Sequence, residues 1–339
     1  MIRVLGRAPG GPRDDYSMRS LGLALLVFVA VVAVSAPMLA PHDPAETFRG
    51  FLHAPPMRPR VIGADGTWHP PFVYPLRLVS RLEQRYEEDR TRMVPLVFLS
   101  GGRLVRLADE RRGPWLVLGA DRDGRDLASR LVFGARTSLG VAGLATLVAL
   151  LLGTVIGGLA GYCGGALDEA LMRLAEFVIV LPVVYVVLAL RAALPLVMAP
   201  WAIFSLMTGL FALVGWPWVA RAVRATVARE RERDYVAAAV SLGAGHARLL
   251  VGHLLPACRG LVGTQAVLLL PSFILAEATL SYVGLGFPDE VASWGSMLQQ
   301  AADVSALADF PWTLAPAGAI FAVTLGANLV LRSTPRVPR

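Results

Sequence analysis

The chain has 339 residues, of which 55% are hydrophobic and only 17% are charged. Its mean hydropathy of +0.57 and its apolar fraction exceed those of an ordinary soluble domain, which excludes that class. All 32 basic residues are arginine. A chain without lysine is neither a standard P-loop ATPase, whose lysine reaches the phosphates, nor a lysine Schiff-base enzyme.

Six apolar segments each have close to the ~20 residues that cross the hydrocarbon core of a bilayer. We therefore expect an all-α polytopic membrane protein with six transmembrane helices. The first segment ends near Val34-Ser35-Ala36, which resembles a signal-peptide cleavage site, but Pro37 follows and the apolar run continues. We interpret it as an uncleaved anchor. The predicted spans are residues 21–40, 138–161, 176–195, 201–220, 261–283 and 312–331.

The distribution of arginine predicts the orientation. Arginines are concentrated before the first span, in residues 221–260 and in the C-terminal tail, whereas residues 284–311 contain four acids and no arginine. Short cytoplasmic loops carry the excess of Lys and Arg. Both termini and the loop 221–260 are therefore predicted to be cytoplasmic, and six spans agree with that parity.

Residues 41–118 form a predicted extracytoplasmic insert. Its many prolines exclude a long helix, and residues 94–108 alternate around Ser100-Gly101-Gly102 in the way that is typical of a hairpin. We expect a small, irregular, β-rich module. The predicted organisation is a cytoplasmic tail (1–20), the first span (21–40), the insert (41–118) and a five-helix domain (119–335) that contains the cytoplasmic loop 221–260.

Residues 119–139, GADRDGRDLASRLVFGARTSL, alternate acids with arginines before an apolar run. Asp126 is the predicted N-cap of the helix that follows. Two interpretations stay open from the spacing alone. The segment is either an amphipathic helix at the outer membrane interface or a solvated entrance to the second span.

Residues 234–256, DYVAAAVSLGAGHARLLVGHLLP, place small residues between two apolar spans. We expect a helix over 224–242, a turn at Gly243-Ala244-Gly245, and a second short helix that ends before Pro256. Three interpretations are a packing corner, a DNA-binding helix-turn-helix and a docking site for a cytoplasmic partner. About forty residues between the flanking spans are too few for a DNA-binding domain, so packing and docking remain.

Glu277 is an acid inside a predicted span. Ionisable groups in membranes are costly and face a bundle interior or a wet cavity. Glu277 is therefore either a pathway or gating residue, or a partner for a backbone group freed by a kink at Pro271.

Residues 234–256 resemble the EAA signature of inner-membrane permeases of binding-protein-dependent ABC importers. Ala238 and Ala239 take the alanine places, and Gly243 takes that of the glycine. Ala237 stands where the family has glutamate and His253 where it has isoleucine, and Glu232 or Asp234 are the alternatives for the missing acid. The resemblance implies an ATPase-coupling role for Asp234, Ala237, Ala238, Ala239, Gly243, Ala244, Leu255 and Pro256.

The resemblance extends over about residues 119–335 and is to the dipeptide, oligopeptide and nickel permease branch. Residues 161–177 and 272–298 are similar to its first cytoplasmic loop and to its fifth span with the outer loop. Residues 119–139 resemble the branch pattern GTD-x-x-GRD-x-x-SR-x-x-x-GAR-x-SL, with Ala120 in place of threonine. The matching residues there are Gly119, Asp121, Gly124, Arg125, Asp126, Ser129, Arg130, Gly134, Ala135 and Arg136.

The resemblance implies the type I ABC importer permease fold in a bacterial inner membrane. The chain would form half of a pathway for peptides, or for a nickel complex or opine, beside a second homologous permease. Two cytoplasmic ATPases would use ATP and Mg, and an extracytoplasmic binding protein would deliver the solute. We expect no enzyme activity and no cofactor, metal or nucleic acid bound by this chain. Alternatives are a permease for another solute, an exporter, a passive channel or an intramembrane protease, and the protease reading lacks an H-E-x-x-H motif.

Overall fold

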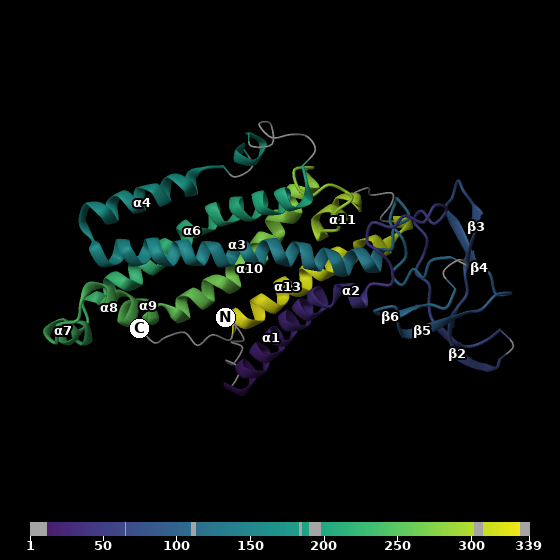
Figure 1. Cartoon of the computed structure of the whole chain (residues 1–339), viewed down its shortest axis with the longest axis horizontal. Helices are drawn as coiled ribbons and strands as arrows, with labels where there is room; N and C mark the ends of the chain where they lie inside the picture. Colours follow the sequence, from purple (N-terminus) through teal and green to yellow (C-terminus); the bar gives the residue numbers. More distant parts are fainter. Residues whose placement is uncertain are drawn as a thin grey trace, which may run out of the picture.

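Long apolar helices dominate the computed structural model. Five of the described helices are long and apolar enough to cross a membrane, and Figure 1 shows them side by side. They are α1 (Pro12–Val34), α3 (Leu127–Cys163), α6 (Pro200–Arg231), α10 (Arg259–Tyr282) and α13 (Ala315–Arg332), the last preceded by the 3-10 turn η3 (Pro311–Leu314). The structure describes residues 12–64, 66–109, 113–182, 185–189, 198–301 and 308–332, without the side chains of residues 12–16 and 332.

The two ends of the helix bundle differ. Figure 1 shows the strands at one end and the short helix α7 (Asp234–Ser241) at the other. We call these the insert end and the loop end. α3 runs from the first to the second, so one helix joins the two.

Five of the six predicted spans correspond to these long helices, with different bounds. The third predicted span, 176–195, begins within α4 (Gly165–Val180), which ends where Leu181 turns extended (ψ 121°) before Pro182, as the residue before a proline tends to do. Residues 183–184 and 190–195 of that span lie outside the described part. The first predicted span is divided at Ser35 into α1 and the short α2 (Ala36–Leu39).

α3 is longer than the predicted second span. It contains 37 residues, which at 1.5 Å each gives a rod of about 55 Å, far longer than the ~30 Å hydrocarbon core. The expected N-cap is confirmed, because the Asp126 side chain accepts from the N–H groups of Ala128 and Ser129. The prediction of a separate amphipathic helix at the outer interface is wrong, since residues 127–137 are the first turns of α3 itself.

A stripe of glycines lets α3 approach α6 closely. Gly153, Gly157 and Gly161 are spaced four residues apart and lie on one face of α3. A Cβ on Gly157 would lie 2.3 Å from the carbonyl oxygen of Ala220, and one on Gly161 would lie 2.6 Å from that of Arg224. Any larger side chain would push the two helices apart. This is small-residue packing of the kind that membrane helices use.

Close contacts also join α1 to α13 and α4 to α6. Gly22 of α1 faces α13, where a Cβ would lie 2.7 Å from the carbonyl oxygen of Gly326. α4 is joined to α6 by an ion pair in which the guanidinium of Arg224 donates to both carboxylate oxygens of Asp168, at 2.5 to 3.2 Å.

The insert contains a small sheet with its own apolar core. The predicted hairpin over 94–108 is confirmed, because Ser100 pairs with Arg103 across Gly101 and Gly102, which have φ of 62° and 78°. Four strands are ordered β1-β2-β5-β6, and β3 pairs with β4. The strands are β1 (Arg60–Ile62), β2 (Trp68–Val73), β3 (Leu76–Ser80), β4 (Arg85–Glu88), β5 (Val94–Ser100) and β6 (Arg103–Leu107).

The loop end differs from the expected helix-turn-helix in two ways. First, α6 continues to Arg231 and breaks before α7, so residues 221–231 of the predicted loop are helical. Second, Pro256 does not end the second helix. α8 (His246–Leu249) passes through a π-helical segment (Leu250–Leu254) into α9 (Leu255–Ala257). The proline lies at the start of α9, directly after the π-helical segment.

Candidate functional site

α7 and the turn after it present apolar side chains to solvent. Leu242 is 89% exposed and Val240 is 54% exposed, and Ala237 and Ala238 are exposed as well. Gly243 has φ +83°, a left-handed conformation that glycine adopts without penalty. No atom of the described residues lies within 4 Å of the position a Gly243 Cβ would take. Gly243 is therefore needed for the shape of the turn, and space around it is open.

Buried leucines and a valine hold this turn to the bundle. Val236, Leu249 and Leu254 belong to the main apolar core, and Ala239 and Ala244 pack partly against it. Leu255 fits over Gly158 of α3, where a Cβ would lie 2.9 Å from its Cδ2. The predicted coupling residues thus divide into a face that anchors the segment and a face that is exposed.

Asp234 lies on the same side of α7 as Ala237, because residues three apart are neighbours on a helix surface. Both are exposed, so a carboxylate is present one turn from the position where the family has glutamate. Glu232 precedes α7 at the end of α6 and is not on that helix.

Sequence reasoning missed Val240 and Leu242. Both occupy positions that the motif leaves free, and the sequence offers no signal that distinguishes an exposed leucine from a core leucine here. Exposed large apolar side chains grouped at one tip are typical of a protein contact surface.

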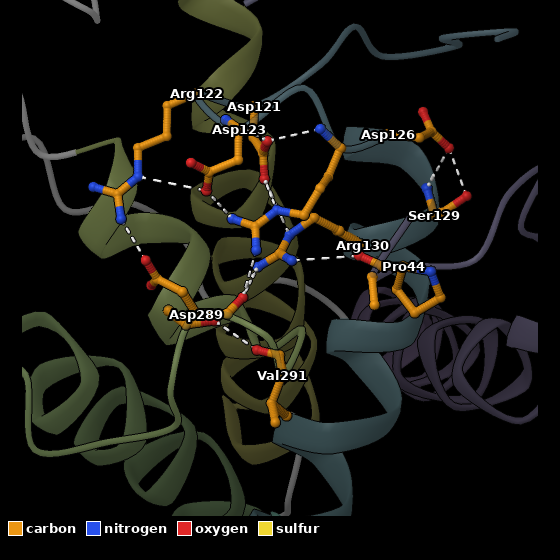
Figure 2. A network of polar contacts seen from close by, with 12 residues as sticks. Pro44, Asp121, Arg122, Asp123, Asp126, Ser129, Arg130, Asp289 and Val291 are labelled. Carbon is orange, nitrogen blue, oxygen red and sulfur yellow. Dashed lines mark hydrogen bonds and ion pairs between the residues drawn. The ribbon is translucent and has the colours of Figure 1, made fainter. Parts of the chain in front are cut away.

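At the insert end, a buried cluster joins the start of α3 to two distant segments (Figure 2). The side chain of Arg130 is fully buried, and those of Asp121 and Arg125 are 4% and 7% exposed. Asp121 accepts from Arg125 Nε at 2.8 Å and lies 3.4 Å from Arg130 Nε. The prediction of a solvated span entrance is therefore also wrong.

The two arginines converge on one carbonyl oxygen. Arg125 Nη1 and Arg130 Nη2 donate to the backbone oxygen of Asp289, at 2.8 and 3.0 Å, and Arg130 also donates to the oxygen of Pro44 at 3.4 Å. Figure 2 shows Arg130 reaching between Pro44 and Asp289. The cluster therefore fastens the beginning of the insert and the segment after α10 to the first turn of α3.

The surrounding motif residues shape this cluster. Gly119 and Gly124 have φ of 82° and 76°, and a Cβ on either would lie 2.6 Å from a backbone oxygen of the insert. Burial raises the pKa of Asp126 to about 6, against the hydrogen bonds from Ser129 and Ala128 that lower it. Arg136 is exposed on α3 and makes none of these contacts.

Glu277 is fully buried within the bundle. It accepts hydrogen bonds from the hydroxyls of Ser138 on α3 (3.0 Å), Ser281 on α10 (2.9 Å) and Ser293 (2.9 Å). Ser293 caps α11 (Trp294–Gln300), so the carboxylate links three elements. These contacts do not involve the backbone next to Pro271.

The described residues contain no group of three or more His, Cys, Asp or Glu side chains placed to hold a metal ion. Cys163 is exposed and Cys258 is buried.

The fold and these sites define a polytopic membrane protein that offers an exposed helical turn at one end and a β-containing insert at the other. A family model described as the inner membrane component of binding-protein-dependent transport systems matches residues 153–334. A second, the N-terminal transmembrane domain of oligopeptide transport permease C, matches residues 19–56. The chain belongs to the family of binding-protein-dependent transport system inner membrane components, so it is a transport subunit without an ATPase site of its own.

Named relatives are similar over most of their length. The oligopeptide transport system permease protein OppC of Bacillus subtilis is 36% identical over 213 residues, which is 62% of this chain and 67% of that protein. The di/tripeptide transport system permease protein DppC of Pseudomonas aeruginosa is 32% identical over 282 residues, covering 83% and 75%. OppC of Lactococcus lactis subsp. lactis is 27% identical over 280 residues, covering 77% and 94%.

Proposed function

We propose that this chain is a permease subunit of an ATP-driven peptide importer. The named relatives are oligopeptide and di/tripeptide permeases, which favours peptides over a nickel complex or an opine. In this proposal the chain pairs with a second homologous permease, each forming half of the pathway. Two cytoplasmic ATPases use ATP and Mg, and an extracytoplasmic binding protein delivers the peptide.

The observation that carries the coupling role is the exposed turn at the loop end. Leu242 and Val240 project into solvent while Val236, Leu249 and Leu254 fix the turn to the bundle core. A rigidly anchored apolar tip can enter a cleft on an ATPase and transmit its movement to the helices. The proposed coupling surface is Asp234, Ala237, Ala238, Val240, Leu242 and Gly243.

The proposed orientation places the loop end and both termini in the cytoplasm. The arginine-rich loop 221–260 is then inside, as the positive-inside rule requires. The tail 1–20 is also inside, the insert 41–118 is outside, and residues 119–335 form the transport domain. In this proposal the pathway runs along α10. Glu277 acts there by joining α10 to α3 and α11, and Pro271 also lies inside this helix.

The test uses the complete transporter in membrane vesicles with its binding protein. Gly243→Trp should abolish co-purification of the ATPases and reduce ATP-dependent uptake of a labelled tripeptide to background. Gly165→Trp is the matched control, because Gly165 also has positive φ (59°) and no atom in the described part of the chain lies within 4 Å of its Cβ position. Normal uptake by Gly243→Trp would overturn the coupling role.

A second variant separates shape from contact. Leu242→Ser keeps the backbone but removes an exposed apolar side chain, and the loss of one central interface residue costs more than about 1 kcal/mol. We expect about tenfold weaker ATPase binding. The peptide assignment itself would be contradicted if excess peptides failed to compete with the transported solute.

A further inference from the structure

The loop-end terminus of α3 contacts the turn directly. The hydroxyl of Tyr162, in the last turn of α3, lies 2.5 Å from Nδ1 of His246, the first residue of α8. The two rings meet edge to face, with centroids 5.8 Å apart at 71°. His246 follows Gly243 by three positions, so this contact is at the base of the exposed turn.

Arg231 joins the same contact from α6. Its Nη1 donates to the carbonyl oxygen of Tyr162 at 2.6 Å, and its guanidinium lies 5.7 Å from the centre of the Tyr162 ring. The last carbonyls of a helix have no partner within it, and an arginine there is favoured by the helix dipole. The ends of α3 and α6 and the start of α8 thus meet at Tyr162.

α3 makes further contacts at both of its ends. At the loop end, Gly158 lies one helical turn before Tyr162. Leu255 packs over Gly158, and the glycine stripe locks α3 against α6. At its first turn, Arg130 holds the oxygens of Pro44 and Asp289. One uninterrupted helix therefore has defined contacts with the turn at one end and with the outer segments at the other.

We propose that Tyr162 is a positioning residue for coupling: with Arg231 and His246 it clamps the ATPase-docking turn to α3, so that turn and α3 move as one body. This inference rests on the proposed function. The movement that an ATPase imposes on the turn is then delivered through α3 to the ion cluster at the insert end, where the segments that face the binding protein are attached.

The first test measures two rates in the complete transporter. Tyr162→Ala removes the hydrogen bond to His246 and the ring contact with Arg231. Together these contacts stabilise the clamp by an amount equivalent to about a tenfold change in an equilibrium constant. We expect binding-protein-stimulated ATPase activity and uptake to fall about tenfold, while ATPase retention and basal hydrolysis stay within about twofold. Tyr162→Phe keeps the ring but loses the hydroxyl, so its stimulated ATPase activity and uptake should fall only about threefold. Arg229→Ala is the control for Arg231→Ala, because the side chain of Arg229 is exposed and pairs only loosely with that of the half-buried Glu230, at 3.7 Å.

The second test fixes the clamp covalently. In a Cys163→Ser, Cys258→Ser background, Tyr162→Cys and His246→Cys are joined by a short bifunctional thiol reagent. Before cross-linking, this variant lacks the clamp and should show the low stimulated activity of Tyr162→Ala. If the turn and α3 move as one body, the cross-link restores the stimulated activity. If they move past each other during the cycle, the cross-linked transporter stays inactive, and the proposal is overturned.

The outcomes separate this inference from the function on which it rests. Should Gly243→Trp abolish ATPase binding while Tyr162→Ala transports normally, only the clamp is refuted. Should Gly243→Trp have no effect, the docking turn itself is refuted. If Tyr162→Ala fails to reach the membrane, Tyr162→Phe and the cross-link decide.

Discussion

Replacing Asp121 by alanine tests the ion cluster at the start of α3. The change removes the carboxylate that pairs with Arg125 and lies beside Arg130, and leaves two buried guanidiniums close together. Removing one partner of a buried pair costs about 3–5 kcal/mol. If only one of the two charge-assisted hydrogen bonds to the Asp289 oxygen is lost with it, the segment 287–292 is destabilised by about 1.5 kcal/mol, or about tenfold.

Hydrogen–deuterium exchange of the purified protein measures this effect. Amides of residues 287–292 should exchange at least about tenfold faster in Asp121→Ala than in the unchanged protein. Asp289→Ala is the matched control. Its carboxylate is 36% exposed and pairs with the exposed Arg122, while its backbone oxygen is retained, so the cost should be about 0–1 kcal/mol. The reasoning fails if exchange is unchanged in Asp121→Ala, or if the control is equally fast.

Three further predictions concern stability in detergent, read as the midpoint of thermal unfolding. Gly157→Leu should prevent α3 from packing on α6, because even a Cβ would lie 2.3 Å from the Ala220 oxygen, whereas Gly143→Leu, with open space at its Cβ, should be tolerated. Glu277→Leu leaves three buried serine hydroxyls without their acceptor, at about 1–3 kcal/mol each, and Glu277→Gln should lose much less. Burial raises the pKa of Asp126 to about 6 from 3.8, so its contribution is full below pH 3.8 and is lost as pH rises through 6. Asp126→Asn keeps an N-cap and should gain stability relative to the unchanged protein between pH 5 and pH 7, and an equal difference at both pH values would contradict this.

The sequence alone determined the features that depend on neighbouring residues. Hydropathy located five of the described spans, because crossing a bilayer needs about 20 consecutive apolar residues. Asp126 was identified as a helix cap and Gly101-Gly102 as a turn, since capping and positive φ involve residues only a few positions apart. The spacing of Ala238, Ala239, Gly243 and Pro256 indicated the family.

Tertiary structure decided the features that depend on distant partners. Arg130 reads as a solvated arginine until its burial against Asp121 and the Asp289 oxygen is seen. Nothing in the local sequence marks Leu242 as exposed, yet it is 89% exposed. The free energy of a charge or an apolar side chain depends on what surrounds it in space. Chain positions 159 residues apart, such as Arg130 and Asp289, leave no local pattern that reveals their contact.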